Sequence, residues 1–142
     1  MVGACSRTSL LRSLLGRFAS TEQERAHAIL DQLGIGEYAQ MPVRTLSGGQ
    51  RQRVAIARSL MQQPRILLAD EFVSQLDLVT AREILELTRA IASEGVTVLM
   101  TTHEVELARE FADRIVMLQD GHVAVDAPAA DVDVARIREV LR

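Results

Sequence analysis

Short, largely apolar runs alternate with helical patterns in this chain, and this alternation constrains its fold more than any other feature. The runs occupy residues 66–69, 96–100 and 115–118. Such runs are typical of strands buried on both faces, as in parallel sheets that are covered by helices. Apolar residues recur at helical spacing between them, over 78–93 and 104–112. The sequence therefore predicts an α/β fold in which right-handed crossovers connect parallel strands.

Further elements are predicted on both sides of this pattern. Helical spacing over 10–18 predicts a first helix. A second begins at Thr21, with a capping-box pattern over 21–24, and stops at Gly34. A third over 48–63 ends before Pro64. Asp120-Gly121 predicts a tight hairpin turn into a strand at 122–126, and a helix over 132–141 closes the chain. Residues 1–20 carry arginines and hydroxyl side chains but no acidic residue, so a transit peptide is the alternative to a helix there.

The charge composition excludes several classes of function. All 16 basic residues are arginines, which excludes Schiff-base chemistry and a phosphate-binding P-loop lysine within this sequence. A net charge of −3 with three Phe, one Tyr and no Trp argues against nucleic-acid binding. The single cysteine, Cys5, cannot form an internal disulfide or a cysteine metal cluster. No apolar run approaches the ~20 residues of a membrane-spanning helix.

The segment Leu46-Ser47-Gly48-Gly49-Gln50 is a candidate anion-binding turn. Serine is a favoured helix N-cap, glycines allow another chain to approach closely, and the N-terminus of a helix attracts negative charge. The alternative is an ordinary turn before a helix.

Two carboxylates, Asp70 and Glu71, follow the first apolar run directly. The carboxyl ends of parallel strands are where α/β sheets bind ligands, so one carboxylate can hold Mg²⁺ through water while the other orients or deprotonates water. His103 follows the next apolar run and can donate a hydrogen bond to a phosphate oxygen. The alternatives are a solvated strand end and a surface histidine. A polar turn, Ser74–Asp77, comes shortly after the carboxylates.

Taken in this order, the segments resemble the ATP-binding cassette (ABC) family of ATPases over residues 7–126. Residues 46–50 resemble the LSGGQ signature, 66–71 the Walker B strand, 74–77 the D-loop, and His103 the switch histidine. Residues 7–18 are similar to the helical subdomain of phosphonate-importer ATPases. The resemblance implies a partial P-loop NTPase-like fold: part of a helical subdomain at 1–46, the signature helix and second half of the catalytic core at 47–126, and a C-terminal helix at 127–142.

The resemblance also implies the ligands and roles of the site. Asp70 would hold the Mg²⁺ shell, Glu71 would polarise water, and His103 would sense the γ-phosphate of ATP. The residues that would serve an ATP bound mainly by a second ATPase subunit, in a head-to-tail dimer, are Ser47, Gly48, Gly49, Gln50 and Asp77. Transmembrane permease subunits would be the other partners, at the cytoplasmic face of the inner membrane, in an importer of phosphonate or a similar small anion.

The chain departs from the family pattern after the second carboxylate. Phe72 and Val73 stand where the family has Pro-Thr, and Gln75 stands where it has Ala.

The family's P-loop, adenine-stacking loop and Q-loop glutamine precede the signature, and we expect this chain to begin after them. We therefore expect it to bind Mg-ATP weakly and to hydrolyse little ATP alone. Two alternatives are a non-catalytic module that docks on a permease or partner subunit, and a soluble family member in DNA repair or translation.

Overall fold

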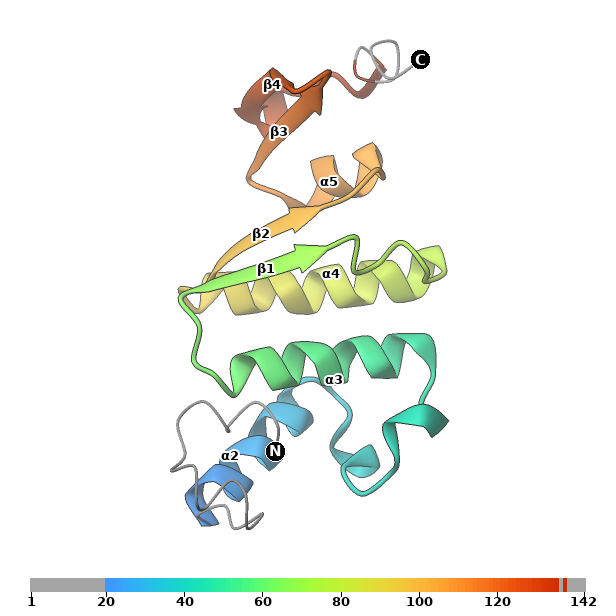
Figure 1. Ribbon diagram of the computed structural model, residues 1–142, viewed down its shortest axis with the longest axis vertical. Coiled ribbons are helices and arrows are strands. Elements are labelled where there is room, and N and C mark those ends of the chain that lie inside the picture. Colours follow the sequence, from blue (N-terminus) through green and yellow to red (C-terminus); the bar gives the residue numbers. More distant parts are fainter. Residues whose placement is uncertain (1–19, 136, 138–142) are drawn as a thin grey trace.

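The computed structural model describes residues 20–135 and 137, which run from helix α2 at one end to a β-hairpin at the other (Figure 1). The helices are α2 (Ser20–Gln32), α3 (Gly48–Leu60), α4 (Leu78–Ser93) and α5 (Val105–Phe111). The strands are β1 (Ile66–Asp70), β2 (Thr97–Thr101), β3 (Arg114–Gln119) and β4 (His122–Pro128). Short 3₁₀ turns are η2 (Gly36–Tyr38), η3 (Val43–Thr45) and η4 (Ala129–Asp131). The helix predicted over 10–18, and most of that over 132–141, lie outside the described residues.

Helix α4 supplies the centre of the hydrophobic core. It lies between α3 and the β1–β2 pair (Figure 1). Its buried positions follow helical spacing and include Ile84, Leu85 and Ile91, each no more than 2% exposed. The buried hydroxyl of Thr88 donates to the carbonyl oxygen of Ile84 (2.7 Å), so the helix buries no unpaired hydroxyl there. The predicted helix over 78–93 is confirmed.

The end of α2 completes the core on the other side of α3. Leu33 and Ile35 are almost fully buried, and Gly34 between them adopts a positive φ of 67° that ends the helix.

None of the helices in the described ranges is long and apolar enough to cross a membrane.

Strands β1 and β2 form a parallel pair whose ends are aligned. Their register places Ile66 opposite Thr97 and Asp70 opposite Thr101. Both strands therefore finish at the same edge, and the residues that follow them are brought together. The predicted parallel crossover through α4 is confirmed.

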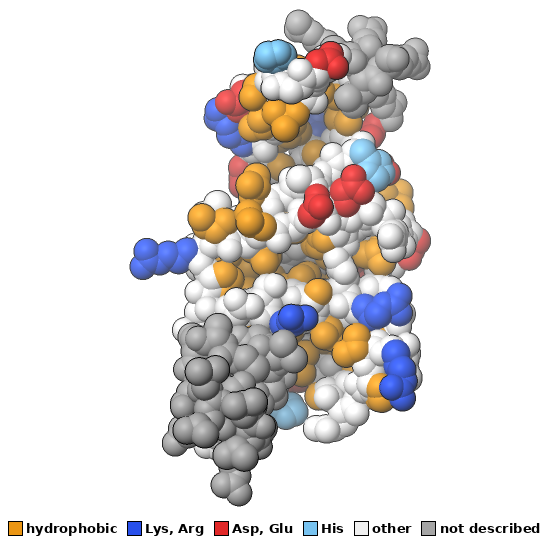
Figure 2. Space-filling view, in the orientation of Figure 1, with side chains coloured by type: hydrophobic (Ala, Val, Ile, Leu, Met, Phe, Trp, Pro, Cys, Tyr) orange, Lys and Arg blue, Asp and Glu red, His pale blue; other side chains and the backbone are white. Residues whose placement is uncertain are grey.

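The prediction that these strands are buried on both faces is wrong for the structure as described. Leu67 is buried, but Ile66, Leu68 and Leu99 are 60%, 72% and 63% exposed. One face of the pair packs toward α4, whereas no described helix covers the opposite face. Figure 2 shows apolar side chains gathered over this part of the surface.

The third predicted strand does not join the same sheet. Among residues 20–135, β3 pairs only with β4, in an antiparallel hairpin, so the chain forms two separate two-stranded sheets. The chain first passes through α5, which packs on α4 and η4, and this places the hairpin beyond the free edge of β2. The hairpin turn itself is confirmed, because Asp120 and Gly121 have φ values of 49° and 78°.

The open apolar face and the free edge of β2 predict self-association. Exposed apolar patches and unpaired strand edges both favour contacts between chains. Light scattering of the purified chain should therefore reveal concentration-dependent oligomers. Leu68→Thr, on the open face, should reduce them, whereas Leu78→Thr, at an exposed leucine at the start of α4, should not. A monodisperse monomer with a sharp, cooperative melt would contradict this expectation.

Candidate functional site

The signature turn is closed by a reciprocal pair of hydrogen bonds at the start of α3. Ser47 is the N-cap: its Oγ accepts from the Gln50 amide (3.2 Å), and Oε1 of Gln50 accepts from the Ser47 amide (2.9 Å). This capping box confirms the predicted N-cap and occupies two of the donors at the helix start. The amides of Gly48 and Gly49, in the first turn, have no partner within the helix. Gly48 is partly exposed, whereas Gly49 is buried.

Packing inside the chain leaves no room for a side chain at Gly49 and little room for one at Gly48. A Cβ atom at Gly49 would lie 2.5 Å from Cγ2 of Thr80, and one at Gly48 would lie 3.1 Å from Cδ2 of Leu76. The signature turn is therefore packed directly on the 74–77 turn and the first turn of α4. This is a structural reason for the glycines, in addition to the anion binding that the sequence indicates.

Asp77 is the N-cap of α4. Its carboxylate accepts hydrogen bonds from the Thr80 amide (3.0 Å) and from the Thr80 hydroxyl (2.7 Å). These two bonds lower the pKa of Asp77 below its usual value, because both stabilise the charged form. The same Thr80 side chain thus contacts the signature turn through its methyl group and the D-loop-like turn through its hydroxyl.

The paired carboxylates lie at the carboxyl end of β1, as predicted. The Thr101 hydroxyl at the end of β2 donates to Oδ1 of Asp70 (2.5 Å) and accepts from the Glu71 amide (3.0 Å). Glu71 has a φ of 42°, a left-handed conformation that is uncommon for any residue but glycine, and its carboxylate is exposed. A strained backbone of this kind is often found at functional sites.

The turn after Glu71 is held by hydrogen bonds, since Phe72 cannot restrict the backbone as proline does. The Ser74 hydroxyl donates to the Glu71 carbonyl oxygen (2.8 Å), and Nε2 of Gln52 on α3 donates to the Phe72 carbonyl oxygen (2.5 Å). The side chain of Val73 is buried in the core. The position of Glu71 is therefore defined by contacts from two other elements, β2 and α3.

His103 lies beside Glu71. Its Nδ1 is 3.6 Å from Oε1 of Glu71, and its Nε2 is 3.6 Å from Oε1 of Glu104. These distances exceed those of hydrogen bonds, so the ring is near the carboxylates without being locked to them. His103 is 60% exposed and can donate to a ligand at this edge. Figure 2 shows acidic and histidine side chains together at the end toward which β1 and β2 run.

All eight predicted site residues thus lie on the side of the molecule toward which β1 points and at which α3 begins (Figure 1). The structure links two groups: Asp70, Glu71 and His103 at the strand ends, and residues 47–50 with Asp77 at the helix starts. The 71–77 segment joins them. The arrangement can present two carboxylates, an imidazole and free helix amides to an anionic ligand with its cation.

A magnesium ion fits this edge only as a partner of phosphate. No cluster of three or more His, Cys, Asp or Glu residues in the described part of the chain could hold a metal by itself. Mg²⁺ is commonly held by one or two carboxylates together with water and substrate phosphates. Asp70 suits this role, because Thr101 occupies one of its oxygens and the residue is exposed to solvent.

No pattern in the sequence indicated a role for Thr101, Thr80 or Gln52. Thr101 and Thr80 contact predicted site residues, and Gln52 contacts Phe72, the residue after Glu71. Thr101 lies two residues before His103, directly after the second apolar run. If the two strands end level with each other, this position falls opposite Asp70. The Gln52–Phe72 bond and the contact of Thr80 with Gly49 carried no sequence signal, because they join elements that are distant in the chain.

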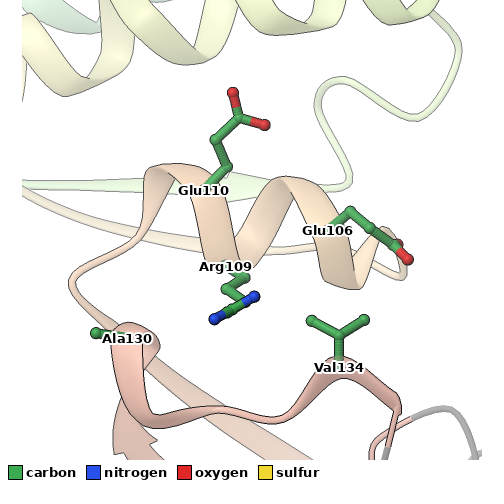
Figure 3. Close-up of a pocket in the computed structure, with 5 residues that line it drawn as sticks. All are labelled: Glu106, Arg109, Glu110, Ala130 and Val134. Carbon is green, nitrogen blue, oxygen red and sulfur yellow. The ribbon is translucent and has the colours of Figure 1, made fainter.

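A hollow between α5 and residues 130–134 lies away from these residues (Figure 3). It is lined by Glu106, Arg109, Glu110, Ala130 and Val134. Glu110 points out of it toward α4, where its carboxylate pairs with Arg82. No predicted site residue faces this hollow, so it is separate from the candidate site.

Comparison with known proteins matches this chain to ABC transporter ATPases. The ABC transporter family model matches residues 3–74. The phosphonates import ATP-binding protein of Bordetella parapertussis is 43% identical over 141 residues, which cover 99% of this chain and 55% of that protein. The hypophosphite import ATP-binding protein of Stutzerimonas stutzeri is 46% identical over 127 residues, covering 89% of this chain and 37% of that protein. The chain thus spans about half the length, or less, of these relatives.

A solved structure gives a similar result. The dimeric, post-hydrolysis state of an ATP-binding cassette bound to ADP and Pi matches with a TM-score of 0.66 and 34% identity. The match covers 84% of this chain and 54% of that chain.

The contact between Gly49 and Thr80 predicts a coupled effect on stability. Alanine normally stabilises a helix relative to glycine, but Gly49→Ala should destabilise the chain by about 1–3 kcal/mol, because its methyl group would overlap Thr80 Cγ2. Thr80→Ser removes that carbon and keeps the hydroxyl bound to Asp77, so the double variant should recover most of the loss. Urea unfolding of the four proteins measures this, and strictly additive effects would contradict it.

The lowered pKa of Asp77 predicts a specific acid sensitivity. The stabilising bonds are fully present above the usual value of 3.8 and are lost as the pH falls through the lowered pKa. Asp77→Asn retains a capping oxygen that does not titrate. The Tm of the parent should therefore fall more steeply than that of Asp77→Asn between about pH 5 and about pH 2.5. Parallel curves would show that the carboxylate is not bound as described.

Proposed function

The chain belongs to the ABC transporter family of ATPases, and from this we propose that it forms the ATP-hydrolysing part of an importer's ATP-binding subunit. The observation that carries the proposal is the pairing of a capped Ser-Gly-Gly turn with the Asp70–Glu71 strand end, joined by the short 71–77 segment. The names of the relatives favour phosphonate, or a related small phosphorus oxyanion such as hypophosphite, as the transported solute.

In this proposal the strand-end residues act on the nucleotide of their own subunit. Asp70 would hold the water shell of Mg²⁺, which neutralises charge on the phosphates when bound. Glu71 would orient or deprotonate the attacking water, for which it is suited by its exposed carboxylate and its fixed backbone. His103, on the other side of Glu71, would donate to an oxygen of the γ-phosphate.

The helix-start residues would act on a nucleotide held mainly by a second subunit. The Ser47 hydroxyl and the free amides of Gly48 and Gly49 would contact phosphate, and Gln50 would keep the turn closed through its bond to the Ser47 amide. Asp77, in the adjoining turn, would lie at the same contact. Two such subunits, arranged head to tail, would close on ATP and open after hydrolysis, and the dimeric state of a similar cassette supports this arrangement.

The partners follow from the role of an import ATP-binding subunit. We propose that transmembrane permease subunits receive the motion and that the chain works at the cytoplasmic face of the membrane, as a peripheral component. The sequence contains no lysine, so the P-loop lysine that cradles the β- and γ-phosphates must come from residues outside these 142.

Replacement of Glu71 tests the proposal in a complete cassette. Such a cassette is made by placing the N-terminal part of the Bordetella parapertussis relative, up to the start of the match, before this chain. Glu71→Gln retains the shape but removes the basic carboxylate, so ATP hydrolysis should fall by about 10²–10⁴-fold while ATP binding persists. The measurements are steady-state turnover and calorimetric titration with Mg-ATP.

Glu86→Gln, the same change on the exposed side of α4, is the matched control and should leave turnover unchanged. Hydrolysis by the Glu71→Gln cassette within about threefold of the parent would reject Glu71 as the catalytic carboxylate. The non-catalytic docking module would then become the better description.

A further inference from the structure

One hydrogen bond joins the helix that begins at the signature turn to the turn that carries Glu71. Nε2 of Gln52, in the second turn of α3, donates to the carbonyl oxygen of Phe72 (2.5 Å). Gln52 is half-buried, and the bond spans 20 residues of sequence. It is therefore a tertiary contact and not part of the local structure of either segment.

The carbonyl of Phe72 is a position from which Glu71 can be controlled. It belongs to the residue directly after Glu71, whose φ of 42° is held from the other side by the Thr101 hydroxyl and carbonyl. Phe72 has no ring that restricts its own backbone φ, as a proline at this position would have. Gln52 therefore acts together with the buried Val73 and with Ser74, which donates to the Glu71 carbonyl oxygen, to hold the far side of this turn in place.

Helix α3 can transmit a displacement because it is bound at several points. Its first turn packs on Leu76 and Thr80 through the two signature glycines. The next residue after Gln52, Arg53, donates to the Leu33 carbonyl oxygen (2.9 Å) and pairs with Glu83 of α4 (2.8 Å). If ligand binding moves the signature turn, α3 would move with it. Because Gln52 of α3 is hydrogen-bonded to Phe72, the turn that carries Glu71 would be displaced as well.

We infer that Gln52 is a positioning residue: through it, the orientation of Glu71 depends on the position that the signature turn takes when it binds a ligand. This rests on the proposed function, in which the signature turn serves one nucleotide and Glu71 another. The Gln52–Phe72 bond would then connect the two nucleotide sites of the dimer within each chain. A mispositioned general base lowers the rate of the chemical step more than it weakens binding, because the binding contacts are untouched.

The inference is tested with Gln52→Met, which keeps the length of the side chain but removes its donor. In the complete cassette described above, kcat should fall about tenfold to a hundredfold while KM for ATP stays within about twofold. Gln52→Lys, which retains an N–H donor at similar reach, should recover most of kcat. Gln62→Met, the same change at an exposed position just after α3, should behave as the parent.

A second measurement needs no ATP and uses the 142-residue chain itself. Hydrogen exchange in the peptide covering residues 71–77 should accelerate in Gln52→Met and not in Gln62→Met, with the melting temperature of both close to that of the parent. A kcat of Gln52→Met within about twofold of the parent, or unchanged exchange in this peptide, would overturn the inference. If Glu71→Gln does not lower ATP hydrolysis, the proposed function is rejected instead. Failure of this inference can therefore be distinguished from failure of the proposed function.

Discussion

Burial of α4 between α3 and the β1–β2 pair is the interaction on which the rest of this structure depends. Three of its side chains, Ile84, Leu85 and Ile91, are among the most deeply buried in the described part of the chain. Because the helix is anchored on both sides, its N-terminus has a defined position between the strand ends and the start of α3 (Figure 1). That position is where Asp77 and Thr80 contact the signature turn.

The candidate site is built from ends of elements rather than from their interiors. Strand ends carry Asp70 and Thr101, and helix starts carry Ser47 and Asp77. Unpaired amides, a strained φ and exposed carboxylates are tolerated there, since the helices and strands behind them are stabilised by the core. The site can therefore be open to solvent while its backbone is held in place, as the proposed binding of a phosphate group requires.

Most of the secondary structure and all of the proposed site residues could be predicted from the sequence. Each helix within the described residues follows apolar spacing, and the hairpin turn follows from Asp120-Gly121. The burial of the strands could not be predicted in this way. An apolar run indicates that both faces can be covered, but it does not reveal whether anything covers them, and Leu68 and Leu99 remain exposed on one face.

The sequence by itself indicated the family, the proposed site residues and the order of the elements, because these depend on residue types at short, regular separations. Tertiary structure alone decided what fixes those residues: the Thr101 hydroxyl between the two carboxylates, the methyl of Thr80 against Gly49, and the Gln52 bond to Phe72. Each joins segments at least 20 residues apart. Such contacts arise from the packing of α3, α4 and β2 around one core, and a local pattern carries no information about that packing.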